Sequence, residues 1–218
     1  MTESIETITL QRMLPAVFRA DHPKESDIWL TELLLYKGKR YLVTAESGAG
    51  KSSFCSFIYG ARRDFDGSLL FNGKDTQALK MDDWQRIRRE NLAYLPQDLM
   101  LFPELTAMEN ILLKNDLTGA VTMSRIEQWL RHLGVYDRKD YPAGKMSVGQ
   151  QQRVALVRAL SQPFDFLLLD EPVSHLDEEN NRKAAALVEQ RATELGAAVV
   201  STSVGNPLLL SDAIVLNL

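Results

Sequence analysis

The sequence predicts an α/β fold with a mainly parallel sheet, an antiparallel β portion at the N-terminus and an inserted helical subdomain. Three features support this prediction. Residues 7–36 alternate apolar and polar side chains in short runs, which is typical of antiparallel strands with one buried face. Residues 166–169 and 198–200 are continuous apolar runs, as expected for strands buried on both faces of a parallel sheet. Between about residues 97 and 160 the pattern is helical only.

Turn and capping residues separate the expected elements. Beyond the antiparallel portion, strands are expected at 41–43, 68–71, 92–95, 166–169, 198–200 and 213–218. Helices are expected directly after residue 50 and at 82–89, 107–113, 124–133, 149–160 and 178–195. Ser124 and Glu127 have the spacing of a capping pair, and Gly134 and Gly196 end their helices. This order divides the chain into a core of residues 1–96 and 161–218 and a helical subdomain of residues 97–160.

The composition limits the class of protein. With 218 residues and 45% hydrophobic side chains, the chain can bury a sizeable core as one domain or one domain with a subdomain. Its 25 basic and 29 acidic residues are interleaved, so we expect no broad basic surface and no nucleic-acid partner. Cys55 is the single cysteine, which favours a core position and a reducing compartment. No window approaches the roughly 18 apolar residues of a membrane span, so a role at a membrane would need a membrane partner.

Residues 45–52 read Ala-Glu-Ser-Gly-Ala-Gly-Lys-Ser between an apolar run and a helix, which indicates a phosphate-binding loop. Gly48 and Gly50 let backbone N–H groups converge on an anion at the positive end of the next helix. Lys51 supplies a charge for the terminal phosphates, and Ser52 offers a hydroxyl to Mg²⁺. The residues expected to bind nucleotide here are Glu46, Ser47, Gly48, Ala49, Gly50, Lys51, Ser52 and Ser53. The alternative is a glycine-rich turn with a surface lysine.

One position departs from the usual pattern of this loop. The pattern Gly-x-x-x-x-Gly-Lys-Ser/Thr has a glycine where this chain has Ala45. Alanine there would cost about 1–2 kcal/mol if the position needs a positive φ. Such strain would weaken the loop without abolishing it.

A second motif places two carboxylates at the end of a buried strand. Asp170 and Glu171 follow the apolar run at 166–169, and ligands of open α/β sheets bind at the carboxyl ends of strands. We expect Asp170 to hold Mg²⁺ opposite Ser52, and Glu171 to orient or deprotonate the attacking water. Alone, the motif could be a strand that leaves the core through an acidic turn. Together with the phosphate loop it predicts a P-loop NTPase core of the RecA-like type.

Between the two motifs, residues 145–153 read Lys-Met-Ser-Val-Gly-Gln-Gln-Gln-Arg, which resembles the signature of ABC-type ATPases. The family pattern is Leu-Ser-Gly-Gly-Gln followed by polar residues and Arg. Ser147 with Gln150 is also an ordinary capping box for the following helix. The order of further motifs favours the functional interpretation, because Pro96-Gln97 matches the family's Gln loop and residues 174–177, Ser-His-Leu-Asp, look like its D-loop.

The resemblance covers nearly the whole chain, from about residue 10 to residue 218, and is greatest to ATPases of the lipoprotein-release, macrolide-export and cell-division exporter type. Such ATPases work as pairs, with each ATP between the phosphate loop of one subunit and the signature of the other. Ser147, Gly149 and Gln150 would then complete the partner's site, and Gln97 would lie near Mg²⁺ and the attacking water. The implied cofactors are ATP and Mg²⁺.

The implied partner is an integral membrane permease subunit, which would place the chain on the cytoplasmic face of the cell membrane. The pair could be a homodimer or include a sister ATPase. An adenine-stacking aromatic is also expected near the N-terminus, where an ungapped alignment puts Ala20, with Phe18 two residues away.

Two further positions depart from the family. Val148 replaces the first glycine of the signature, and Ser203 stands where the family has a switch histidine. As a third candidate catalytic residue, Ser203 could position water or phosphate. Its neutral hydroxyl lacks the charge-assisted hydrogen bond of an imidazolium, about 1.5–3 kcal/mol, so turnover could be slow. The leading interpretation is an ATP-hydrolysing transport subunit, and the alternative is an ATP-gated dimerisation module that scarcely hydrolyses.

Overall fold

A computed structural model describes residues 3–20, 25–46 and 48–218. The strands are β1 (Thr7–Pro15), β2 (Glu32–Tyr36), β3 (Arg40–Thr44), β4 (Phe65–Phe71), β5 (Lys74–Asp75), β6 (Leu92–Leu95), β7 (Phe166–Asp170), β8 (Ala198–Ser203) and β9 (Ile214–Asn217). The α-helices are α1 (Lys51–Ile58), α2 (Met81–Glu90), α3 (Ala107–Asn115), α4 (Met123–His132), α5 (Val148–Leu160) and α6 (Glu178–Leu195). The predicted α/β class, with both kinds of sheet and a helical insertion, is confirmed.

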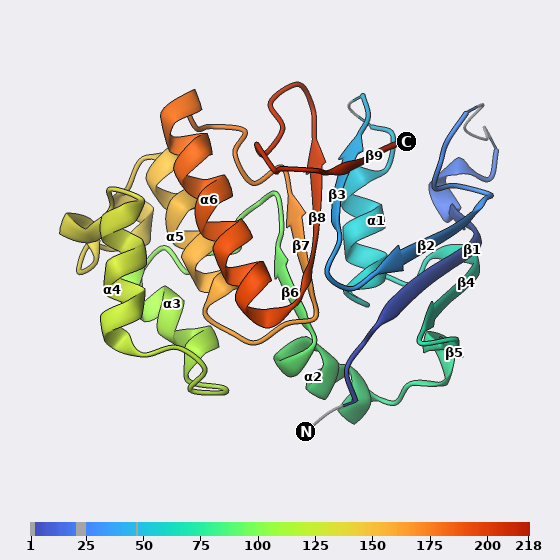
Figure 1. The fold of residues 1–218 in the computed structure, drawn as a ribbon, viewed down its shortest axis with the longest axis horizontal. Helices are drawn as coiled ribbons and strands as arrows, with labels where there is room; N and C mark the ends of the chain where they lie inside the picture. Colours follow the sequence, from blue (N-terminus) through green and yellow to red (C-terminus); the bar gives the residue numbers. More distant parts are fainter. Residues whose placement is uncertain (1–2, 21–24, 47) are drawn as a thin grey trace.

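The strands form two sheets. One is parallel throughout, in the order β6-β7-β8-β3-β9, and the other is antiparallel, in the order β2-β1-β4-β5. Figure 1 shows the parallel sheet between α1 on one side and α5 and α6 on the other, with the antiparallel sheet beyond α1. The expected strand at 68–71 is the end of the longer β4, which pairs with β1.

Both faces of the parallel sheet are covered, as its apolar strands predict. All five residues of β7 are buried. Phe166 and Leu168 pack into the cluster that includes α1 and the antiparallel sheet, whereas Leu167 and Leu169 pack into the cluster of the helical side. Strand alternation separates these two sets, because successive side chains point to opposite faces. The alternation matters for the site, since it decides which polar residues at the strand ends face α1.

Between residues 97 and 160, all of which the structure describes, there are helices and no strand. The division of the chain into a core and a helical subdomain of residues 97–160 stays a prediction. The expected capping pair of Ser124 and Glu127 is wrong: the N-cap of α4 lies two residues earlier, at Thr122, whose side chain accepts a bond from Arg125 N–H. Glu127 instead pairs with Arg131 and with a lysine at position 139. The expected ends of α4 and α6 are confirmed, since Gly134 and Gly196 have φ of 65° and 60°.

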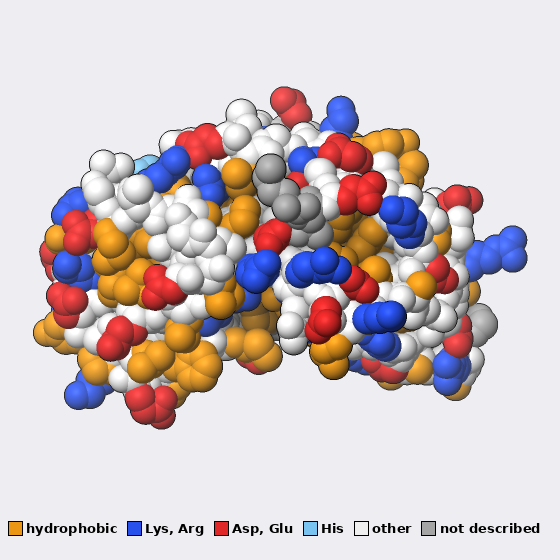
Figure 2. Space-filling model, turned by 90° about the horizontal axis from the view of Figure 1, so that it is seen from below, with side chains coloured by type: hydrophobic (Ala, Val, Ile, Leu, Met, Phe, Trp, Pro, Cys, Tyr) orange, Lys and Arg blue, Asp and Glu red, His pale blue; other side chains and the backbone are white. Residues whose placement is uncertain are grey.

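The surface agrees with the charge pattern of the sequence. On the face in Figure 2, basic and acidic side chains are interspersed, and apolar side chains lie among them. Within the described ranges, no helix is long and apolar enough to cross a bilayer.

Candidate active site

The phosphate loop connects β3 to α1, and its glycines have the backbone that the sequence predicts. Gly48 and Gly50 have φ of 88° and 98°, values that L side chains rarely adopt. Gly50 is the N-cap of α1, so the first N–H groups of that helix open toward the loop. Ser47 lies outside the described residues. The condition for strain at Ala45, a positive φ, is not met, because Ala45 is not among the described residues with positive φ.

Two aromatic side chains support this loop from the N-terminal part of the chain. Trp29, 2% exposed, donates from Nε1 to Ala49 O over 3.2 Å. A Cβ on Gly50 would lie 3.0 Å from Phe18 Cε2 and 3.3 Å from the Trp29 ring. Phe18, the residue close to the expected adenine-stacking position, therefore packs on the loop itself. Sequence reasoning missed Trp29, because a single tryptophan in a short apolar run carries no signal of what it will contact.

Lys51 is held at the start of α1, beside the amides that would bind an anion. The residue is 5% exposed, and Nζ donates to Glu46 O over 2.7 Å and to Ala45 O over 3.2 Å. Its charge adds to the positive end of the helix dipole. Ser53 is directed elsewhere, since its hydroxyl accepts a bond from Arg62 over 2.9 Å.

Three oxygen-bearing side chains from separate elements line one cavity of about 550 Å³, namely Ser52 of α1, Gln97 after β6 and Asp170 of β7. Ser52 Oγ lies 3.4 Å from Gln97 Oε1. Asp170 is 1% exposed, and its Oδ2 has no hydrogen-bond partner among the described residues. The structure therefore brings these three residues to one cavity, while their role as metal ligands stays a prediction.

This donor set fits Mg²⁺, which binds few protein oxygens and keeps most of its water. A buried carboxylate oxygen without a donor is costly unless a cation or water satisfies it. The described part of the chain has no group of three or more His, Cys, Asp or Glu residues that could hold a metal by themselves. Ser52, Gln97 and Asp170 offer a hydroxyl, an amide oxygen and a carboxylate at this cavity.

Glu171 has an unusual backbone, with φ of 51°. A left-handed conformation at a non-glycine residue costs about 1–2 kcal/mol, and outliers of this kind are found at functional sites. Buried side chains hold both sides of the residue: its N–H donates to Thr202 Oγ1 over 3.2 Å, and its C=O accepts from Gln152 Nε2 over 3.0 Å. The Glu171 side chain is half-buried at the end of β7.

The signature residues lie at the start of α5. Ser147 and Gln150 form the capping box, with Ser147 N–H to Gln150 Oε1 at 3.0 Å and Gln150 N–H to Ser147 Oγ at 3.3 Å. Gly149 packs on the loop after β7, because a Cβ there would lie 3.0 Å from His175 O. Val148 is 50% exposed. None of these residues lines the cavity of Ser52, Gln97 and Asp170.

Gln152, which sequence reasoning missed, connects α5 to the loop after β7. It is 2% exposed. Besides Glu171 O, its Nε2 donates to Ser174 Oγ over 3.1 Å, and its Oε1 accepts from His175 N–H over 3.1 Å. A run of three glutamines gave no indication of which one turns inward. The signature helix and the D-loop segment are thus joined through one buried amide.

Ser203 is the last residue of β8 and is 3% exposed, and its Oγ lacks a hydrogen-bond partner in the part of the chain that the structure describes. The neighbouring Thr202 pairs in register with Asp170, and its Oγ1 donates to Asp170 Oδ1 over 2.7 Å. Because side chains alternate along a strand, Thr202 and Ser203 point to opposite faces. The residue of β8 that bonds the Asp170 carboxylate and the Glu171 backbone N–H is therefore Thr202, and a catalytic role for Ser203 stays a prediction.

Burial changes the acidity of two side chains near the cavity. It raises the pKa of the Cys55 thiol well above its usual value, and the charge of Asp170 acts in the same direction. Cys55 is completely buried, as the sequence predicts for a core residue. Burial also raises the pKa of Tyr94, which lines the cavity and so stays a neutral phenol at physiological pH.

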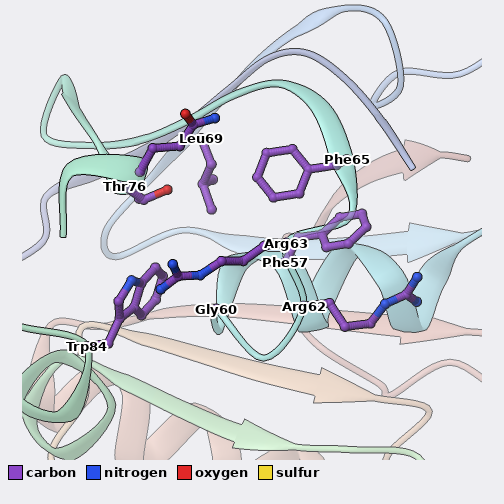
Figure 3. Close-up of a pocket in the computed structure, with 9 residues that line it drawn as sticks. Phe57, Gly60, Arg62, Arg63, Phe65, Leu69, Thr76 and Trp84 are labelled. Carbon is purple, nitrogen blue, oxygen red and sulfur yellow. The ribbon is translucent and has the colours of Figure 1, made fainter. Parts of the chain in front are cut away.

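Another cavity, of about 290 Å³, lies between β4 and the ends of α1 and α2 and contains none of the predicted site residues. Figure 3 shows Phe57 and Phe65 on its walls and Arg63 lying across the Trp84 ring, while Arg62 points away. The Arg63 guanidinium carbon is 5.7 Å from the Trp84 ring centroid. Three of the predicted site residues, Ser52, Gln97 and Asp170, line the cavity of about 550 Å³ beside the phosphate loop.

The glycine-lined loop before α1, the acid at the end of β7 and the parallel sheet between them define a P-loop nucleotide-binding protein. The chain belongs to the ABC transporter family, whose family model matches residues 31–174, and it is an ATP-binding cassette of that family.

Relatives agree with this assignment. The chain is 32% identical to the lipoprotein-releasing system ATP-binding protein LolD 1 of Caulobacter vibrioides, over 83% of this chain and 82% of that protein. It is 28% identical to the macrolide export ATP-binding/permease protein MacB of a Shewanella species, over 84% of this chain but only 29% of that protein. Among solved structures, the dimeric bacterial ABC transporter cassette MJ0796 matches with a TM-score of 0.79 and 25% identity, over 96% of this chain and 94% of that one.

Proposed function

We propose that this chain hydrolyses ATP with Mg²⁺ as one of a pair of cassettes that drives a membrane permease. Lys51 and the loop amides hold the phosphates, and Ser52, Gln97 and Asp170 hold the metal. Bound Mg²⁺ would neutralise charge that develops on the phosphates. Glu171 accepts a proton from the attacking water, as its position one residue beyond Asp170 allows.

One observation carries this proposal. Oxygens of Ser52, Gln97 and Asp170 come from three separate elements and line one cavity beside the glycine-lined loop, and Asp170 keeps one buried oxygen without a donor. A folded chain rarely leaves such an oxygen unpaired unless a ligand or water satisfies it. Lys51 at the start of α1 adds the positive charge that an anion needs.

The proposal includes a second cassette. Ser147, Gly149 and Gln150 lie outside the cavity of their own chain, which supports the idea that they serve the site of a partner cassette. Solved relatives include a dimeric cassette and a post-hydrolysis dimer bound to ADP and Pi. The partner cassette is a second copy or a sister ATPase, and the permease holds the pair at the cytoplasmic face of a membrane.

Steady-state phosphate release tests the hydrolysis step. The wild-type protein should release phosphate from Mg-ATP, and Glu171→Gln should reduce the rate by about 10²-fold or more, the usual loss for a general base. ATP binding, measured by calorimetry, should persist in the variant. Equal, slow release by both proteins, together with normal ATP binding, would reject hydrolysis by this site.

Ser203 favours a second candidate function, a cassette that dimerises on ATP but scarcely hydrolyses it. Its buried hydroxyl has no partner among the described residues and cannot supply the charge of an imidazolium. Ser203→His separates the two candidates. If the neutral Ser203 limits turnover, the variant should release phosphate faster than the wild type. An unchanged rate would show that hydrolysis by this chain does not need a histidine at position 203.

A further inference from the structure

Thr202 lies between the two carboxylate residues of the site. It is completely buried in β8. Its Oγ1 donates to Asp170 Oδ1 over 2.7 Å and accepts a hydrogen bond from Glu171 N–H over 3.2 Å. An amide N–H can only donate, so the single hydroxyl proton of Thr202 is directed to the carboxylate. The three groups form one chain of hydrogen bonds with a fixed direction.

We propose that Thr202 is a positioning residue for both Asp170 and Glu171, and this inference rests on the ATPase function proposed above. At Asp170, the bond occupies Oδ1 and restricts rotation of the carboxylate. Oδ2, which has no partner among the described residues, is then the oxygen left for a cation. Partners that orient a metal-binding carboxylate in this way set its affinity for the metal.

At Glu171, Thr202 acts on the backbone. The residue has φ of 51°, a conformation that needs support from its surroundings. Thr202 binds its N–H from β8, and Gln152 binds its C=O from α5. Together these bonds fix the peptide groups on both sides of the Cα, and so the direction in which the Glu171 side chain leaves the chain.

The neighbouring serine provides a matched control. Ser201 is completely buried in the same strand, but its Oγ has no hydrogen-bond partner in the described ranges. It precedes Thr202, so its side chain lies on the opposite face of the sheet. Ser201→Ala therefore removes a hydroxyl at the same depth without touching either carboxylate.

The experiment compares Thr202→Val, which keeps the shape but removes the hydroxyl, with Thr202→Ser, which keeps the hydroxyl, and with Ser201→Ala. Thr202→Val should reduce kcat for ATP by about 10–100-fold and raise the Mg²⁺ concentration for half-maximal activity by a similar factor. Thr202→Ser should recover most of both losses. Ser201→Ala should match the wild type.

A binding measurement makes the test independent of turnover. Calorimetric titration with ATP, in Mg²⁺ and in EDTA, gives the gain in affinity due to the metal, and this gain should be smaller in Thr202→Val than in wild type. Wild-type kcat and an unchanged gain in Thr202→Val would overturn the inference while leaving the proposed ATPase intact. Losses in Thr202→Ser equal to those in Thr202→Val would also overturn it, because they would come from packing.

Two safeguards keep the outcomes distinguishable. If the wild type releases no phosphate, the proposed function fails, but the effect of Mg²⁺ on ATP binding still tests the orientation of Asp170. If circular dichroism shows that Thr202→Val is unfolded, Thr202→Ala, which also lacks the hydroxyl, takes its place in both measurements.

Discussion

At the scale of single residues, the phosphate loop depends on one position without a side chain. Gly50 combines φ of 98° with close contact to Phe18 and Trp29. Gly119 has φ of 62°, but nothing lies within 4 Å of the place where its Cβ would be. A comparison of substitutions at these two glycines therefore separates the cost of a positive φ from the cost of a steric clash with neighbouring side chains.

We predict that Gly119→Ala costs about 1–2 kcal/mol in the free energy of unfolding, from φ alone. Gly50→Ala should cost a further 1–3 kcal/mol or so, because the aromatic rings must move. It should also weaken ATP binding, since the loop amides shift, whereas Gly119→Ala should not. Urea denaturation and calorimetric titration measure the two effects, and equal losses for both variants would contradict the role given to Phe18 and Trp29.

Individual residues also show which features of the site the sequence indicates and which it does not. The glycines, Lys51 and the acid pair could be proposed from the sequence because their chemistry is local and their spacing is fixed. Strain at Ala45 was expected only on the condition of a positive φ, and the condition is not met; sequence alone does not decide it, because the φ of a loop residue depends on the path of the backbone. Thr202 and Gln152 were missed because their importance comes from contacts with Glu171, a residue distant from Gln152 and from Thr202 in sequence.

At the scale of elements, capping decides where the signature helix begins. Two helices start with the same arrangement: Ser147 and Gln150 at α5, and Thr106 and Glu109 at α3. In the second, Thr106 N–H donates to Glu109 Oε2 over 2.7 Å and Glu109 N–H donates to Thr106 Oγ1 over 3.1 Å. The pair offers a comparison between a cap with a proposed role at a partner's site and one without.

We predict that Ser147→Ala and Thr106→Ala each lower the free energy of unfolding by about 0.5–2 kcal/mol, the usual value of an N-cap. Only Ser147→Ala should reduce ATP-dependent dimerisation. Urea denaturation gives the first quantity, and size-exclusion chromatography in a Glu171→Gln background gives the second. Equal dimerisation of the two variants would show that the Ser147 hydroxyl serves the helix alone.

Elements were predicted well where the apolar pattern is long or where clear capping residues mark the ends of the element. The buried strands β7 and β8, the long helix α6 and its terminal glycine all follow from apolar runs and capping. The start of α4 was wrong, because Thr122 and Ser124 are both good caps and tertiary packing chooses between them. The assignment of β4 to the antiparallel sheet depends on its partner β1, which a local pattern does not reveal.

At the scale of the whole molecule, hydrogen bonds connect the end of β7, where the carboxylates lie, to the signature helix α5. Gln152 joins α5 to the carbonyl of Glu171 and to Ser174 and His175. Gln152 is therefore a direct physical connection between the carboxyl end of β7 and α5, whose N-cap is Ser147. This arrangement agrees with a cassette whose pairing depends on the state of its nucleotide.

We predict that Glu171→Gln is monomeric without nucleotide and dimeric with saturating Mg-ATP, because the variant retains ATP between the two cassettes. Multi-angle light scattering measures the change. With ADP, or with ATP and EDTA, the same variant should stay monomeric. If the variant binds Mg-ATP tightly but stays monomeric at every protein concentration, this would contradict pairing of the chain with itself and favour a sister cassette.

The buried position of Cys55 has a practical consequence. It is the single cysteine of the chain, its thiol is enclosed, and its raised pKa disfavours the reactive thiolate. A cysteine introduced at an exposed position outside the proposed sites, as in Leu117→Cys, would then be the preferred target of a maleimide dye. Fluorescence energy transfer between two labelled copies could follow their approach and separation in real time, without first replacing the native thiol.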